Sequence, residues 1–158
     1  MKYFFTVLSC LFILSMSAQE RKFKDFYKSH KSDAEVSLNV PGFLANIFID
    51  TDGDRELKAL LKKARNYKVL VFDDNTKGVQ KDLRGFISKN DFKTIIKIKD
   101  GNERINIHFK EVKNRIREII VNIYKKNDNV VLLGLKTNLT KRELNNIISK
   151  SSYRFASE

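Results

Sequence analysis

Three carboxylates alternate with other residues along one short segment, a pattern that is typical of metal-binding loops. Asp50, Asp52 and Asp54 are separated by single residues, as at the start of a calcium loop, because a hard cation needs several oxygens close together. Counted from Asp50, however, position six is Arg55, where such a loop needs glycine, and position twelve is Leu61, where it needs glutamate. A polar turn that caps the following helix explains the same residues, so we expect no metal here.

Two further groups of residues have types that support catalysis. Asp73 and Asp74 follow an apolar run, a position where α/β folds often bind ligands or magnesium. Turn formation explains them equally well. His30 falls on a helical face and His108 alternates along a strand, so neither has a nucleophile at a fixed spacing beside it. No reaction follows from these residues.

Cations are the more prominent chemical feature of the chain. Lysine and arginine number 31 against 19 aspartate and glutamate residues, for a net charge of +12. Such a charge favours anionic lipid head groups, anionic glycans or acidic partners. The candidate ligand-binding side chains lie on strands of the second half: Lys93, Lys97, Arg104, His108, Lys110 and Tyr124. Tyr124 is the one aromatic residue in that set, and base stacking needs several, so we do not expect nucleic acid as the partner.

The first eighteen residues predict a secretory signal peptide. Met1 and Lys2 precede the mostly apolar run Tyr3–Met16, and small residues follow it up to Ala18. The run is short for a membrane span, so no transmembrane segment is expected after cleavage before Gln19. We expect a protein exported to the periplasm or secreted. The alternative is a lipoprotein anchored through Cys10, the only cysteine.

The remaining residues, 19–158, predict a single α+β domain. With 42% hydrophobic and 32% charged residues the chain is not of the disordered class. Apolar residues at helical spacing predict helices over residues 22–31, 54–64, 76–89 and 140–148. Alternation or continuous apolar runs predict strands around residues 36–40 and 69–72, followed by four more from Phe92 to Leu135. We expect an antiparallel sheet of about five or six strands with helices packed mainly on one face.

The parity of the last four strands predicts their pairing as a four-stranded antiparallel meander. A three-residue loop at Lys113-Asn114-Arg115 would place Phe109 opposite Ile119, and the residues before and after these would follow in register. Short turns at Asp100-Gly101 and Asn127-Asp128 would complete the meander. Its apolar side chains then share one face, which we expect to lie under helices, and the cationic set occupies the other.

The segment from Phe43 to Ile49 is apolar at every position except Asn46. Such a segment is either buried or a contact surface. If it contacts a partner, the candidate residues are Phe43, Leu44, Ile47 and Phe48.

Several of these features together resemble a known family. The exported leader, the Phe-rich opening helix, the strand end Val69–Asp74, the hairpin Lys99–Ile105 and the closing strand and helix are similar to domain-of-unknown-function family 4252. The resemblance covers Phe23 to Lys150. It implies a small exported bacterial protein, chiefly of the Bacteroidota, with no assigned activity, catalytic residues or cofactor.

We therefore expect an exported, non-catalytic protein that needs no cofactor. It would bind an anionic envelope component or a protein partner through the basic sheet face or the apolar segment. The alternative is a metal-dependent hydrolase that uses Asp50, Asp52, Asp73 or Asp74. The sequence leaves the ligand and the oligomeric state open.

Overall fold

The computed structural model describes residues 22–44, 63–73, 76–125 and 129–155. Several sequence predictions fall outside these residues: the leader 1–18, the helix over residues 54–62, the contact candidates Ile47 and Phe48, the carboxylates Asp50, Asp52, Asp54 and Asp74, and the turn at Asn127-Asp128. No helix in the described ranges is both long and apolar enough to cross a membrane.

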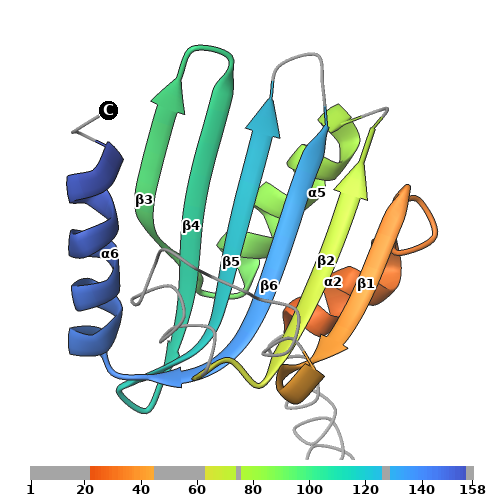
Figure 1. Cartoon of the computed structure of the whole chain (residues 1–158). Helices are drawn as coiled ribbons and strands as arrows, with labels where there is room; N and C mark the ends of the chain where they lie inside the picture. Colours follow the sequence, from red (N-terminus) through yellow and green to blue (C-terminus); the bar gives the residue numbers. More distant parts are fainter. Residues whose placement is uncertain (1–21, 45–62, 74–75, 126–128, 156–158) are drawn as a thin grey trace, which may run out of the picture.

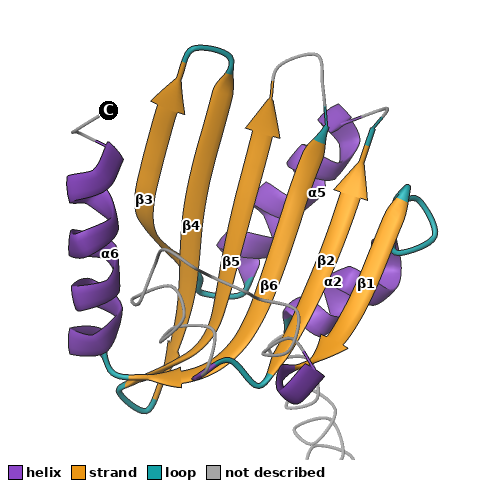
Figure 2. Cartoon of the chain, in the orientation of Figure 1, coloured by secondary structure: helices purple, strands orange, loops and turns teal. Residues whose placement is uncertain are grey.

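The described chain forms one open sheet with helices beside it (Figures 1 and 2). The helices are α2 (Phe23–His30), α5 (Thr76–Lys89) and α6 (Lys141–Phe155). The strands are β1 (Val36–Pro41), β2 (Asn66–Phe72), β3 (Lys93–Asp100), β4 (Glu103–Val112), β5 (Arg115–Lys125) and β6 (Val130–Leu139). All six strands pair antiparallel, in the order β1-β2-β6-β5-β4-β3. This confirms the predicted α+β class and the meander β3-β4-β5-β6.

The register of the meander agrees with its predicted parity. Phe109 pairs with Ile119, and Ile107 pairs with Val121. On the next strand, Leu133 lies opposite Val121. Because side chains alternate between faces, these pairings place one apolar row across three strands on a single face.

The turn that sets this register differs from the predicted three-residue loop. The strands β4 and β5 are joined by two residues, Lys113 and Asn114, with φ angles of 51° and 58°. Two successive left-handed residues are typical of the hairpin turn whose twist matches that of the strands. A bulge then shifts the pairing between Lys110 and Glu111, opposite the step from Ile116 to Glu118. The extra residue in the bulge restores the predicted register.

The two faces of the sheet carry different helices, and we name each face by them. The α2/α5 face carries Leu70, Phe72, Ile120, Val130 and Leu132, which form one core cluster with buried side chains of α2 and α5. The α6 face carries Ile107, Phe109, Ile119, Val121, Leu133 and Leu135, which cluster with Leu144 and Ile147 of α6. In Figure 1, α2 and α5 lie behind the sheet.

This arrangement corrects one expectation about the meander. Its apolar row was expected beneath helices, with the cationic row open on the other side. The apolar row does pack against α6, but α2 and α5 pack on the cationic side, because β2 and β6 are apolar on both faces and supply Leu70 and Leu132 there. On the side of α5 that faces the sheet, Val79, Leu83 and Phe86 are all buried.

The helix α2 approaches the sheet closely at a glycine. A Cβ atom built on Gly134 of β6 would lie 1.9 Å from Cδ1 of Phe23. Phe23 is 3% exposed and stacks against Phe26, with ring centroids 5.9 Å apart. The lack of a side chain at Gly134 therefore makes room for the ring that anchors α2.

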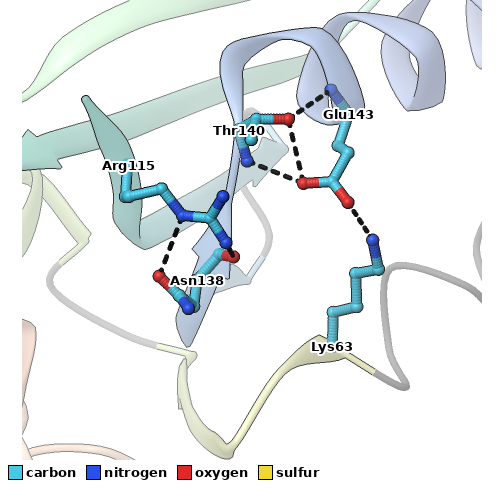
Figure 3. Close-up of polar contacts among 5 residues, drawn as sticks. All are labelled: Lys63, Arg115, Asn138, Thr140 and Glu143. Carbon is cyan, nitrogen blue, oxygen red and sulfur yellow. Dashed lines mark hydrogen bonds and ion pairs between the residues drawn. The ribbon is translucent and has the colours of Figure 1, made fainter.

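The start of α6 is fixed by a capping box between Thr140 and Glu143 (Figure 3). The backbone N–H of Glu143 donates to Thr140 Oγ1 at 3.2 Å, and the backbone N–H of Thr140 donates to Glu143 Oε2 at 2.8 Å. Lys63 Nζ also donates to the Glu143 carboxylate. Arg115 of β5 donates to the side-chain and backbone oxygens of Asn138 at 3.2 and 2.7 Å. These bonds tie the helix start to the end of the sheet.

Candidate functional site

A groove of about 850 Å³ lies between α5 and the strands β3, β4 and β5 on the α2/α5 face. We call it the α5 groove. Helix α5 contributes Lys77, Gln80, Leu83, Arg84, Ile87 and Ser88, and the strands contribute Thr94, Lys97, Ile98, Lys99, Arg104, Asn106, His108, Asn122 and Tyr124. Its volume is within the range of small-molecule sites in proteins.

The lining of the α5 groove carries charge of one sign. Its five charged side chains are all cationic: Lys77, Arg84, Lys97, Lys99 and Arg104. They come from both walls, because α5 supplies the first two and the sheet supplies the others. No carboxylate is among the described residues that line the groove. Like charges gathered beside a low-dielectric wall create a positive potential that attracts anions.

Uncharged polar groups connect the two walls and line the floor. Gln80 Nε2 donates to Asn122 Oδ1 at 3.1 Å, and Asn122 Nδ2 donates back to Gln80 Oε1 at 3.2 Å. Asn122 is only 4% exposed, so this reciprocal amide pair holds α5 against β5. A hydrogen bond of 2.9 Å joins Thr94 Oγ1 and His108 Nδ1.

The surroundings of His108 disfavour its protonation. Burial lowers its pKa below the ordinary value of 6.5, and the nearby Lys97 lowers the pKa further. Both effects disfavour the imidazolium. The ring is therefore neutral at pH 7 and presents hydrogen-bonding groups to the groove without adding to its charge.

A second, smaller hollow of about 350 Å³ adjoins the start of α2, and we call it the α2 pocket. Its charged residues are the cations Lys22, Lys24, Arg65, Lys68 and Lys136 and the carboxylate Glu118. Glu118 Oε2 accepts a hydrogen bond of 3.2 Å from the backbone N–H of Phe23. It therefore occupies the positive end of α2 itself.

The pKa values around the α2 pocket follow burial. Burial raises the pKa of Glu118, although the Phe23 hydrogen bond and then Lys110, Lys22 and Lys136 oppose the rise. Burial also lowers the pKa of Lys68 on β2, with smaller contributions from Lys24 and Lys28 of α2. Since the pocket already contains its own counter-charge, we regard the α5 groove as the better candidate for an anionic ligand.

Four of the six predicted ligand-binding residues line the α5 groove: Lys97, Arg104, His108 and Tyr124. The strand pairing explains why they meet. Arg104 lies opposite Tyr124 on β5 and opposite Lys99 on β3, so the strands bring these side chains into one row. The alternation of apolar and polar side chains along the sequence was enough to predict that these four residues share one face of the sheet.

The other two predicted residues lie elsewhere. Lys93 pairs opposite Phe109, on the α6 face, and its Nζ lies 3.8 Å from Glu111 Oε2. A bulge at Ile95 reverses the alternation ahead of Lys97, which the sequence pattern did not reveal. Lys110 is on the expected face but is 5% exposed, opposite Glu118 and 5.8 Å from the ring centroid of Phe92. It is therefore out of reach of a ligand in the groove.

Of the predicted contact residues, Phe43 is 71% exposed and Leu44 is 37% exposed. Of the predicted hydrolase carboxylates, the structure describes Asp73 alone, which is exposed at the end of β2. The described residues hold no group of three or more histidine, cysteine or acidic side chains that could bind a metal ion.

Sequence reasoning missed the contribution of α5 to the groove. Lys77, Gln80, Arg84 and Ser88 follow one another at helical spacing, beside the buried row of Val79, Leu83 and Phe86. That spacing was visible in the sequence. What was missing was the knowledge that α5 lies on the same face as Lys97 and Arg104.

Comparison with known proteins gives one match. A family model described as "Domain of unknown function (DUF4252)" matches residues 27–147, an interval that contains all six strands and the whole α5 groove. No curated protein and no solved structure matches the chain.

Proposed function

The chain belongs to the DUF4252 family, whose function is unknown, and we propose that it is an exported, non-catalytic protein that binds an anionic component of the cell envelope in the α5 groove. The observation that carries this proposal is the charge of the lining: five cations from two walls and no described carboxylate. A groove of one sign concentrates ligands of the opposite sign.

The polar groups of the groove also favour binding over catalysis. Thr94 and His108 have the hydrogen-bonded contact of a nucleophile and its base. A catalytic base of this kind needs a third group, usually a carboxylate, that orients the ring and stabilises the imidazolium. At His108 the neighbouring charge is instead Lys97, which disfavours the imidazolium. The pair is suited to hydrogen bonding with a ligand.

Retention on defined anionic surfaces tests the proposal. The purified protein is assayed on phosphatidylglycerol vesicles, on phosphatidylcholine vesicles and on immobilised dextran sulfate, over a series of salt concentrations. We expect salt-sensitive retention on one or both anionic supports and none on phosphatidylcholine. The two anionic supports distinguish a lipid head group from an acidic glycan.

A pair of charge-matched variants locates the binding. Lys97→Glu/Arg104→Glu reverses two cations of the groove, whereas Lys81→Glu/Lys89→Glu reverses two exposed lysines of α5 that do not line it. Both variants change the net charge equally. We expect the groove variant to lose retention and the control to keep most of it. Equal losses would show that net charge alone causes retention, and the proposal would be wrong.

A further inference from the structure

The open sheet has two edges, and they differ in how strongly they are protected against pairing with another strand. The edge strand β3 carries Lys93, Lys97 and Lys99, all exposed. Lysines on an edge prevent further strands from adding to a sheet. The other edge strand, β1, has the sequence Val-Ser-Leu-Asn-Val-Pro without a charged residue. In the described ranges no strand pairs with the outer side of β1, where a strand of another chain could add.

Exposed apolar side chains are concentrated at this same edge. Val36 is 40% exposed and Leu38 is 50% exposed, and Phe43 and Leu44 follow directly after the strand at 71% and 37%. Among the large hydrophobic side chains classed as exposed in the described ranges, the only other is Val112, in the β4–β5 hairpin. Such a concentration of apolar surface is typical of a contact with another protein.

The two ends of β1 differ in charge. The exposed carboxylate Glu35 precedes the strand. The end at Pro41 adjoins the cations of the α2 pocket: Pro41 pairs with Asn66, Gly42 donates its backbone N–H to Arg65, and Asn39 pairs with Lys68. The edge is therefore acidic where β1 begins and basic where it ends.

We propose that two copies of this chain associate through β1, as antiparallel strands around a two-fold axis near Leu38. Antiparallel pairing places the beginning of each β1 beside the end of the other. Glu35 of each copy then approaches the Arg65 end of its neighbour, so the edge is complementary to itself in charge. Val36, Leu38 and Val40 share one side of the strand, and pairing continues that apolar row into the second copy. The self-complementarity is what selects a second copy over an unrelated partner.

The first test is the oligomeric state of the purified protein, measured by sedimentation velocity over a range of concentrations. We expect a dimer that dissociates on dilution. Leu38→Lys should weaken it by at least about tenfold, because it places two lysines at the centre of the pairing. Val112→Lys, the same change at an exposed apolar residue far from β1, should leave the dimer unchanged. Circular dichroism checks that both variants keep their sheet.

A charge exchange tests the antiparallel arrangement itself. Glu35→Lys and Arg65→Glu should each weaken the dimer, and the double variant should recover most of the loss, because the exchange restores opposite charges at both ends. A protein that stays monomeric at every concentration would overturn the proposal. The same holds if the monomer binds phosphatidylcholine vesicles through Leu38, because the edge would then contact lipid and not a second copy. A dimer that Leu38→Lys leaves unchanged would also overturn it.

Discussion

The contact between Phe23 and Gly134 gives a prediction whose sign is opposite to the usual effect of the substitution. In a strand interior, replacing glycine by alanine ordinarily stabilises a protein by about 0.5–1 kcal/mol, because the unfolded chain loses freedom. At Gly134 the new Cβ would lie 1.9 Å from Cδ1, 2.2 Å from Cε1 and 2.8 Å from Cγ of Phe23. Carbon atoms in contact are about 3.5–4.0 Å apart, so the ring must move by roughly 2 Å.

The cost of that movement follows from the burial of the ring. Overpacking of a buried site typically costs about 1–3 kcal/mol. Complete expulsion of a buried phenylalanine costs about 3–5 kcal/mol, which is an upper bound here. We therefore expect Gly134→Ala to lower the free energy of unfolding by about 1–3 kcal/mol, measured by urea denaturation followed by circular dichroism.

Two comparisons make the reasoning refutable. Gly85 lies in α5, and a Cβ there would have no heavy atom within 4 Å. Gly85→Ala should therefore stabilise the protein, by up to about 1 kcal/mol. In a Phe23→Ala background the ring is gone, and Gly134→Ala should cost little or nothing. A loss of the same size in that background would show that the clash with Phe23 is not the cause.

Three further predictions concern individual polar groups. Retention on dextran sulfate should strengthen as the pH is lowered from 7, because a bound anion favours the imidazolium of His108, whose pKa is lowered in the free protein; His108→Gln should remove this dependence. Asn122→Ala should lower the free energy of unfolding by about 1–3 kcal/mol, since it leaves Gln80 without its amide partner; Gln80→Met/Asn122→Leu should cost less than Asn122→Ala. Finally, the hydrogen bond from Lys63, followed by the capping hydrogen bonds of Thr140, holds the pKa of Glu143 at about 2, below its ordinary 4.5. Its contribution to stability is complete above pH 4.5 and is lost as the pH falls towards 2, so the stability difference between wild type and Glu143→Gln should disappear over that interval in acid denaturation curves.

The pairing of the strands was predictable because side chains alternate with a period of two. Once the turn at Asn114 is recognised, that period places Ile107 and Val121 on the same face of the sheet, even though the turn itself has two residues. The capping box at Thr140 was equally local, since both partners lie within one helical turn. Patterns of this kind depend on a few neighbouring residues, so the tertiary packing of the other elements does not change them.

The face to which helices dock was not predictable in the same way. Strands β2 and β6 read as continuous apolar runs, because both of their faces are covered, and such runs do not say which face receives α5. The groove depends on that choice, since Arg84 meets Arg104 only when α5 lies on the cationic side. The bulge at Ile95 was hidden for a related reason: one extra residue reverses every side chain before it, and Lys93 moves to the other face.

The position of β6 in the sheet has a consequence for how the chain is made. The strand that comes last in the sequence is inserted between β2 and β5, so among the described strands the β1–β2 pair joins the rest of the sheet through residues 130–136. A nascent chain that has not reached Val130 cannot close the sheet, and contacts so distant in sequence form slowly. The polypeptide thus remains incomplete as a structure until synthesis is nearly finished.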